Sequence, residues 1–362
     1  MNDFENDISI VILTHNRQHC LDSVLPFWEK TSLRTIVVDQ SPKPYARAGN
    51  FTNLEYFYID APFAQRCKVA SELINSQYAI VISDDELYLR SGLEAMWETL
   101  KKDANLVSVG GVAISVWKYG PQTCGAWPYS KTFRLVNKGQ SPLERVALHT
   151  GNGFNPMSSF FTSNLCKSDY LKHCLRLYGK SKSIATEAIS LLTICGGGQS
   201  EYIDSLYWIR NWNEAPRSHQ GWDRSLMIHK WWELNQDNEI GRQFRKDLMD
   251  EFAKFADITF FDEIWGIIMR ASRTTEPKNL SLSSASWQSY SHLINYAKWA
   301  LKSVVARNSL PKNYQQVLDE MNEKGVRFRD AEVEEAISIV EKLRPYKEWK
   351  REKWGNRRSN VY

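Results

Sequence analysis

The amino-acid sequence predicts an α/β fold with a mixed, mainly parallel sheet, flanking helices and an all-helical C-terminal extension. Over the first hundred residues, short apolar runs rich in β-branched residues alternate with apolar residues at helical spacing. Such alternation requires crossover connections, which produce a parallel sheet covered by helices. After about residue 222, apolar residues recur at helical spacing only, as between Ile240 and Phe255.

The expected elements follow one another in a regular order. Strands are expected at residues 8–13, 35–38, 54–59, 78–82, 106–115 and 202–209. Helices are expected at residues 21–28, 67–74, 89–100, 168–178, 184–195, 240–255, 290–304, 314–321 and 333–343. A stretch rich in Gly, Pro and aromatic residues through about Pro156 favours loops and short strands. We divide the chain into an α/β domain (1–222, with halves 1–115 and 116–222) and a helical region (223–362).

Length and composition exclude several classes of protein. With 362 residues and 43% hydrophobic residues, the chain is neither disordered nor collagen-like, and it has room for about two domains. A net charge of +4 is too small to indicate a nucleic-acid partner. The start is acidic, no apolar run approaches the length of a membrane span, and six cysteines are scattered without CxxC pairs. We therefore expect a soluble, cytoplasmic protein without disulfides.

Three consecutive carboxylates follow the strand expected at residues 78–82. Asp84, Asp85 and Glu86 lie at the edge of the sheet where parallel strands present their carboxyl ends, and ligands bind at such edges. Adjacent carboxylates repel one another, and a divalent cation such as Mg²⁺ with phosphate oxygens stabilises them. The alternative is a solvated acidic turn at the start of a helix, where carboxylates interact favourably with the helix dipole.

Three segments carry a resemblance to a known family. They are SIVILTHNR, then VVDQS, then AQRCKVASELINSQYAIVISDDE. In this order and spacing they resemble the nucleotide-sugar-binding half of a bacterial-type GT-A glycosyltransferase, similar to family 2, over residues 8–115, and more loosely over 150–220. The resemblance implies a GT-A, Rossmann-like fold and an enzyme that transfers a sugar from a nucleotide-sugar donor.

The resemblance also implies roles for individual residues on the donor side. Thr14, Asn16 and Arg17 would line the nucleotide pocket, Asp39 would accept a hydrogen bond from the base, and Asp84 would face the ribose or the metal. The remaining expected donor contacts are Gln65, Arg66, Lys68, Asp85 and Arg210. A divalent ion, Mn²⁺ or Mg²⁺, would be held by Asp84, Glu86 and His219. Glu86 departs from the family, which usually has Asp there.

On the acceptor side, the resemblance implies an inverting reaction with a carboxylate as general base. Glu187, in the first turn of a helix, matches the family's base, and Asp169 is the second choice. A Glu in a first turn is also a common partner of the helix dipole. Aromatic residues near this side are candidates for a sugar-stacking platform or for ordinary core packing: Trp117, Trp127, Tyr129, Trp208 and Trp212.

Two other functions remain open from the sequence. A nucleotidyltransferase shares the strand and helix alternation, but its phosphate loop after the first strand is Gly-rich, whereas this chain has THNRQHC. A non-catalytic saccharide-binding protein with a degenerate transferase domain is the other, and Glu86 is the feature that favours it. A Rossmann oxidoreductase is excluded because no GxGxxG follows the first strand.

The C-terminal tail concentrates the positive charge of the chain. Residues 344–362 hold seven Lys or Arg and two Glu, interleaved with Tyr346, Trp349 and Trp354. Such a tail can contact an anionic membrane surface, where lipid-linked glycan acceptors reside, or it can be a solvated terminus. The expected partners are thus a nucleotide-sugar donor, a saccharide or lipid-linked acceptor, and peripherally a membrane.

Overall fold

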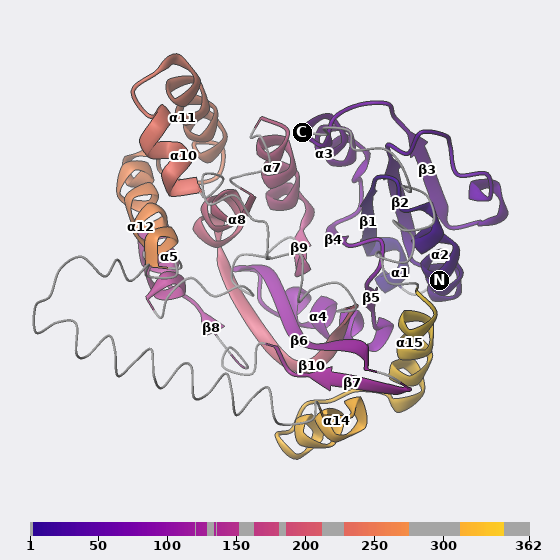
Figure 1. The fold of residues 1–362 in the computed structure, drawn as a ribbon. Coiled ribbons are helices and arrows are strands. Elements are labelled where there is room, and N and C mark those ends of the chain that lie inside the picture. Colours follow the sequence, from indigo (N-terminus) through magenta and orange to yellow (C-terminus); the bar gives the residue numbers. More distant parts are fainter. Residues whose placement is uncertain are drawn as a thin grey trace, which may run out of the picture.

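The computed structural model centres on one mixed sheet of ten strands (Figure 1). It describes residues 3–119, 121–128, 134, 136–151, 163–180, 186–211, 228–274 and 312–343. The strand order is β3-β2-β1-β4-β9-β6-β10-β5, with β7 paired to β6 and β8 paired to β10. The pairs β1–β2, β1–β4, β2–β3 and β6–β10 are parallel. The short strands add the antiparallel pairs of the sheet.

The bounds of the strands agree closely with the apolar runs of the sequence. The strands are β1 (Ile8–Thr14), β2 (Arg34–Asp39), β3 (Leu54–Tyr58), β4 (Tyr78–Ile82), β5 (Leu87–Tyr88), β6 (Leu106–Tyr119), β7 (Gln122–Ala126), β8 (Val136–Asn137), β9 (Leu165–Lys167) and β10 (Gln199–Asn211). All six expected strands are present. The four additional strands, β5, β7, β8 and β9, have two to five residues each. Such short segments leave almost no periodic signal in a sequence.

The helices cover both faces of the sheet. In the N-terminal half they are α1 (Asp3–Asp7), α2 (Gln18–Thr31), η1 (Ala48–Asn50), α3 (Phe63–Leu73) and α4 (Arg90–Lys102). The middle of the chain adds α5 (Pro142–Thr150), α7 (Ser168–Tyr178), α8 (Thr186–Ser190) and η4 (Leu191–Cys195). The C-terminal part contains α10 (Ile228–Asn235), α11 (Glu239–Phe252), η7 (Ile258–Phe260), α12 (Phe261–Thr274), α14 (Tyr314–Glu323) and α15 (Asp330–Lys342).

One expectation for the middle of the chain is wrong, and another is confirmed in part. The stretch expected to form loops and short strands contains helix α5, which starts with Ser141 as its N-cap and a proline at its first position. Ser141 accepts a hydrogen bond from the backbone of Glu144, so local capping chemistry stabilises this helix. The helix expected at residues 184–195 is present over its described residues, α8 and η4, and its second half, η4, is a π-helix. The helix expected at residues 290–304 lies outside the described residues.

The sheet separates two hydrophobic clusters. Along β1, Ile8, Ile10 and Ile12 belong to one cluster and Val11 belongs to the other. The first cluster includes residues of α2, α4, α14 and α15, and the second includes residues of α3, α5, α7, α11 and α12. Because successive side chains of a strand point to opposite faces, a continuously apolar strand is buried on both sides. This three-layer arrangement leaves the strand ends as the place for polar side chains.

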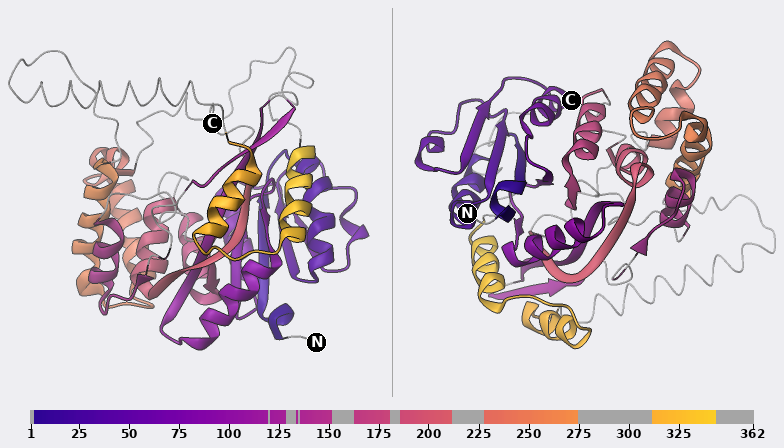
Figure 2. Two further views of the ribbon diagram at one scale, coloured as in Figure 1. Left: turned by 90° about the horizontal axis from the view of Figure 1, so that it is seen from below. Right: turned by 180° about the vertical axis from the view of Figure 1, so that it is seen from behind.

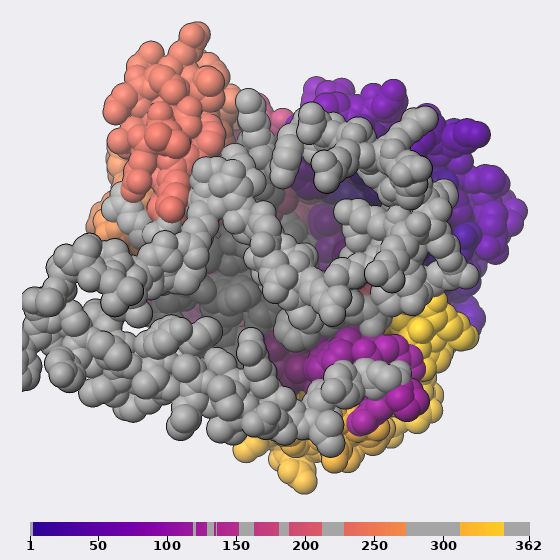
Figure 3. All heavy atoms as spheres, viewed as in Figure 1, coloured from indigo at the N-terminus to yellow at the C-terminus, as the bar shows by residue number. Residues whose placement is uncertain are grey.

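The C-terminal helices pack on the α/β part in two separate places. Helices α10–α12 join the second cluster and contact α5 and α7, whereas α14 and α15 contact β7, β6 and β10. Backbone hydrogen bonds fix the second group: Gly125 N donates to Lys312 O at 3.0 Å, and Leu206 N donates to Arg327 O at 2.9 Å. The two groups lie apart in the turned views (Figure 2) and at opposite ends of the space-filling view (Figure 3). The division at residue 222 stays a prediction.

Three further observations bear on the sequence-based expectations. The six cysteines are free thiols and all are buried. Among the described residues, no helix combines the length and the hydrophobicity needed to cross a bilayer. A cavity of about 510 Å³ lies between α14 and α15, lined by residues such as Leu318, Asp319 and Glu334, and none of the expected site residues lines it. The expected acidic motif lies at the strand ends instead.

Candidate functional site at the carboxyl edge of the sheet

The carboxyl ends of β1, β2 and β4 bring three polar side chains to one edge. Thr14 and Asp39 are the last residues of β1 and β2 and lie opposite each other in the parallel register. Thr14 Oγ1 donates a hydrogen bond of 2.6 Å to Asp84 Oδ2, just beyond the end of β4. Both side chains of this bond are buried, with Asp84 only 3% exposed. The three polar motifs expected at the strand ends thus meet, as parallel topology requires.

Arg17 connects the turn after β1 to the acidic motif. Its Nη1 lies 3.0 Å from Asp84 Oδ1, and its Nη2 forms an ion pair with Asp85. The turn that places Arg17 there contains Asn16 with φ of 57°, a left-handed conformation that Asn tolerates better than most residues. The backbone N–H of Asn16 donates to Ser41 Oγ at 3.1 Å. Local backbone geometry therefore positions the arginine between the two aspartates.

Asp39 is held by donors of the chain itself. Its Oδ1 accepts hydrogen bonds from the backbone N–H and the hydroxyl of Ser41, at 2.7 and 2.6 Å. Its Oδ2 accepts from Gln18 Nε2 at 2.9 Å and from the Tyr56 hydroxyl at 2.7 Å. A carboxylate has about four acceptor sites, and all are occupied here. To bind a nucleobase, Asp39 would exchange Gln18 or Tyr56 for the ligand.

Glu86 faces a different strand from Asp84. Its Oε2 accepts a hydrogen bond of 2.8 Å from Trp208 Nε1, and its Oε1 accepts one of 3.3 Å from Arg210 Nε. The Arg210 guanidinium also stacks over the Trp208 ring, 4.7 Å from its centroid. Strand β10 supplies both partners, so β10 closes the acidic motif from the side opposite to β1. The expected site residues Glu86 and Arg210 are therefore in direct contact.

Burial makes two of these carboxylates unusual. Burial raises the pKa of Asp84 above its ordinary range, the Arg17 guanidinium lowers it, and the Asp85 carboxylate raises it further. Burial is likewise the main reason that the pKa of Glu86 is raised, and Arg210 opposes this shift. Desolvation disfavours a charged carboxylate, and a neighbouring carboxylate adds to that effect. Buried acids with raised pKa values at a strand end are typical of functional sites.

Helix α3 contributes one of its three expected donor-binding residues to this edge. Arg66 is 6% exposed, and its Nη1 donates a hydrogen bond of 2.6 Å to the backbone oxygen of Thr14. Gln65 and Lys68 lie on the exposed side of the same helix, and Lys68 is 3.9 Å from Glu72. The arginine is thus a structural neighbour of Thr14, whereas the other two side chains face solvent.

A divalent ion does not fit the acidic motif as the described residues arrange it. Asp84 accepts from Thr14 and Arg17, Glu86 accepts from Trp208 and Arg210, and Asp85 pairs with Arg17. Among the described residues, no group of three or more His, Cys, Asp or Glu side chains is placed to hold a metal. His219 lies outside the described residues, so the expected set of Asp84, Glu86 and His219 stays a prediction.

The expected base lies on helix α8, and the residues before Thr186 are not described. Glu187 is the second described residue of α8, and its side chain is not among those described. Asp169, the second choice, is 87% exposed in its side chain and 3.9 Å from Lys172 in the first turn of α7. The role of Glu187 as a base therefore remains a prediction.

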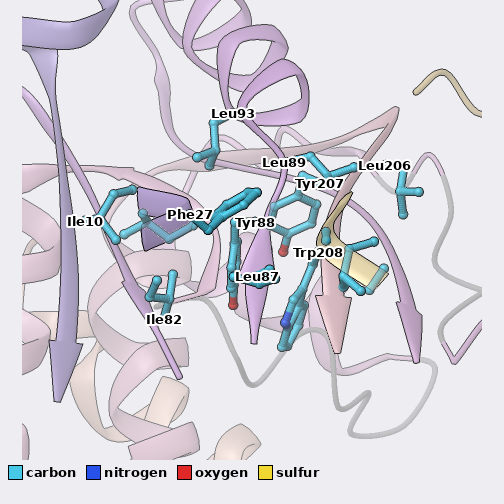
Figure 4. Packing of buried hydrophobic residues seen from close by; sticks show 14 of the residues in the cluster. Ile10, Phe27, Ile82, Leu87, Tyr88, Leu89, Leu93, Leu206, Tyr207 and Trp208 are labelled. Carbon is cyan, nitrogen blue, oxygen red and sulfur yellow. The ribbon is translucent and has the colours of Figure 1, made fainter. Parts of the chain in front are cut away.

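One residue of the expected sugar-stacking platform, Trp208, is buried in the core. Trp208 is 3% exposed and stacks on Tyr88 with 5.5 Å between ring centroids, inside the core cluster (Figure 4). A buried indole cannot stack on a sugar, so Trp208 belongs to the core and to Glu86. Trp117 and Trp127 are half-buried and remain candidates, whereas Tyr129 and Trp212 lie outside the described residues.

Several residues that hold the site were not singled out from the sequence. Gln18 and Tyr56 bind Asp39, and Ser83 Oγ donates to Asp85 Oδ1 at 2.8 Å. Only Ser41 carried a local signal, because an Asp followed two residues later by Ser favours an Asx turn. Tyr56 lies 17 residues from Asp39, and only the parallel pairing of β2 with β3 brings the two together.

Comparison with known proteins identifies the fold. No protein-family model matches the chain, and no curated protein matches its sequence. The crystal structure of S. aureus TarS 1–349 in complex with UDP aligns with a TM-score of 0.50 and 12% identity, over 80% of this chain and 78% of that one. The mannosyltransferase PcManGT from Pyrobaculum calidifontis, in complex with GDP-Man and Mn²⁺, aligns with a TM-score of 0.42 and 15% identity, over 82% and 80%.

These similarities define the fold class. At such low identity they concern the path of the chain, and the TarS alignment with its TM-score of 0.50 carries that statement. Together with the mainly parallel sheet and its flanking helices, this alignment shows a GT-A-like α/β fold. This confirms the expected fold class, while membership of family 2 stays a prediction.

Proposed function

We propose that this chain transfers a sugar from a nucleotide-sugar donor to a saccharide or glycan-precursor acceptor. The observation that carries the proposal is the meeting of Thr14, Arg17 and Asp84 at the carboxyl edge of β1 and β4. Ligands of open α/β sheets bind at this edge. The buried acids and the guanidinium groups beside them offer partners for the hydroxyl and phosphate groups of a nucleotide-sugar.

The proposal extends to the reaction and its partners. Glu187 is the proposed base that removes the proton of the acceptor hydroxyl in an inverting displacement, which gives typically 10²- to 10⁴-fold acceleration. The same chemistry serves a free or a lipid-linked acceptor, and the basic tail at residues 344–362 is the proposed membrane contact. Deleting residues 345–362 tests that contact, since it should abolish sedimentation with anionic vesicles and leave donor hydrolysis unchanged.

A divalent ion, Mn²⁺ or Mg²⁺, is a separate and measurable part of the sequence-based proposal. It depends on His219 and on carboxylates that already accept hydrogen bonds from the chain. The ion would compete with Arg17 for Asp84, or with Trp208 and Arg210 for Glu86. Donor binding is therefore measured both in EDTA and in Mn²⁺.

A nucleotide screen tests the proposed function. UDP, GDP, CDP and dTDP are each added to the full chain, and its thermal unfolding is followed with and without Mn²⁺. A ligand at 100 times its Kd stabilises the folded state by about 2.7 kcal/mol, which is a measurable shift. We expect at least one nucleotide to raise the melting temperature and the matching nucleotide-sugar to be hydrolysed slowly. The absence of any shift under both conditions would refute the proposal.

A further inference from the structure

We propose that the guanidinium group of Arg17 takes the place of a divalent ion at this edge, so that the diphosphate of the donor binds without metal. The inference rests on the proposed function, because it concerns how the same site holds a nucleoside diphosphate. It departs from the sequence-based expectation of Mn²⁺ or Mg²⁺. The inference is argued from the contacts of Arg17 and from the hydrogen bonds that the carboxylate oxygens already accept.

Arg17 occupies a bridging position between two carboxylates. Its Nη1 is 3.0 Å from Asp84 Oδ1, and its Nη2 pairs with Asp85 Oδ2. The planar fork of an arginine delivers two parallel N–H bonds, and its charge is fixed at any physiological pH. One guanidinium thus joins the two aspartates in the way that a shared cation would.

The oxygens of the acidic motif are already engaged by donors of the chain. The two oxygens of Asp84 contact Thr14 and Arg17, and those of Asp85 contact Ser83 and Arg17. The two oxygens of Glu86 accept hydrogen bonds from Trp208 and Arg210. A divalent ion requires several oxygen lone pairs directed at one point, with tight octahedral geometry in the case of Mg²⁺. These oxygens are directed at separate N–H and O–H donors instead, on β1, in the turns after β1 and β4, and on β10.

Arg17 keeps donors for a ligand after making these contacts. A guanidinium carries five N–H groups, and the Nε of Arg17 is buried without a hydrogen-bond partner in the described part of the chain. The side chain is 28% exposed, so part of it faces solvent. Its Nη2 also lies 3.8 Å from Cys20 Sγ, so the N–H groups left for a phosphate oxygen are one on Nη1 and the one on Nε.

Arg66 supplies a second guanidinium on the same strand end. It is 6% exposed, it donates to the backbone oxygen of Thr14, and its Nε also lacks a hydrogen-bond partner among the described residues. Thr14 in turn donates to Asp84, the partner of Arg17. Two arginines therefore approach the end of β1 from α3 and from the β1–α2 turn, and a diphosphate has two negative groups to match them.

The first test uses the wild-type chain and compares two conditions. Binding of UDP, GDP, CDP and dTDP is measured by isothermal titration calorimetry in EDTA and again in millimolar Mn²⁺. Binding that is not linked to the metal has the same affinity in both, so we expect Kd values within about threefold of each other for the nucleotide that binds. Binding that appears only with Mn²⁺ overturns the inference and leaves the proposed function standing.

The second test removes the guanidinium. In EDTA, Arg17→Gln should weaken binding of that nucleotide about tenfold or more, which is the loss expected for charge-assisted hydrogen bonds. The affinity of Arg17→Lys should lie between those of the wild type and Arg17→Gln. Arg329→Gln is the matched control, because Arg329 precedes α15 and pairs with Glu94 and Glu332 rather than with the acidic motif. Unchanged affinity in Arg17→Gln overturns the inference. If none of UDP, GDP, CDP and dTDP binds the wild type under either condition, the proposed function itself fails, and this inference falls with it.

Discussion

Two buried carboxylates in different regions of the molecule behave in opposite ways. Asp84 at the sheet edge is 3% exposed and Glu251 on α11 is 6% exposed, and each is paired with an arginine. Burial alone would raise the pKa of Glu251, but side-chain hydrogen bonds from Lys254, His173 and Arg176 lower it to about 2. Burial raises the pKa of Asp84, and Arg17 does not fully reverse this.

The difference lies in the neighbours. Around Glu251 the partners are the cations Arg176 and Lys254 and the imidazole of His173, and all three stabilise its charged form. Asp84 shares its arginine with a second carboxylate, Asp85, which disfavours its charged form. A carboxylate surrounded by cations stabilises a fold. A carboxylate that competes for one cation is suited to exchanging partners with a ligand.

The largest expected effect is on activity at the sheet edge. Asp84→Asn keeps the shape of the side chain and removes its charge, so Arg17 loses one anchor and its position shifts. A misplacement of about 1 Å at a reacting site can cost 100-fold in rate, and we expect at least about that loss in donor hydrolysis. The free energy of unfolding should change by less than about 1 kcal/mol, because Arg17 keeps Asp85. Full activity in this variant would show that the charge of Asp84 is not needed for donor hydrolysis, contrary to the contrast drawn with Glu251.

The second effect is on stability and concerns Glu251. Glu251→Gln leaves Arg176, Lys254 and His173 without a buried anion. Breaking a buried ion pair is strongly destabilising, and with Lys254 and Arg176 partly exposed we expect a loss of about 2 kcal/mol in urea unfolding. Activity per folded molecule should be unchanged. Asp250→Asn, the exposed neighbour on the same helix, is the control and should stay within about 0.5 kcal/mol.

The pH dependence of stability gives an effect of known sign. The pKa of Glu251 is about 2 in the folded state against an ordinary value of 4.5, so the folded chain binds fewer protons between these values. The stabilisation by Glu251 is complete above the unfolded pKa and is lost as pH falls through about 2. The difference between wild type and Glu251→Gln should therefore shrink by about 2 kcal/mol between pH 5 and pH 3. A constant difference would show that Glu251 acts through packing alone.

The smallest effect belongs to the exposed partner of the same cluster. The side chain of Lys254 is 52% exposed, and solvent screens its ion pair with Glu251. Lys254→Ala should cost about 0.5 kcal/mol, as solvent-exposed pairs do. Urea unfolding at low and high salt measures it, and the cost should fall as salt rises. A loss as large as that of Glu251→Gln would mean that Lys254, rather than Arg176 and His173, holds the carboxylate.

Much of the N-terminal half could be predicted from the sequence because its signals are local. Strand β4 and helix α7 have the predicted bounds, Tyr78–Ile82 and Ser168–Tyr178. A strand buried on both faces is continuously apolar, and a parallel sheet places polar residues at strand ends, which makes Thr14, Asp39 and Asp84 predictable. Helix α5 escapes prediction because its start depends on the Ser141 cap inside a Gly- and Pro-rich stretch.

The partners of the site residues depend on contacts that are distant in the sequence. Glu86 meets Trp208, 122 residues away, and the pairing of β5 with β10 brings the two strands together. The sequence pattern around Trp208 is that of any strand. It therefore does not distinguish an indole that stacks on a sugar from one that donates a hydrogen bond to Glu86. The position of a hydrogen-bond donor relative to a carboxylate is a property of the folded chain.

The amino-acid order was sufficient to specify the layered α/β architecture and the edge at which the acidic residues meet, because hydrophobic periodicity and strand polarity are local properties. The cation that each acid faces emerged only from the folded chain: Arg17 for Asp84, Arg210 for Glu86 and Arg176 for Glu251. Desolvation and Coulomb interactions depend on distances across the fold, whereas the residue types are the same in every case.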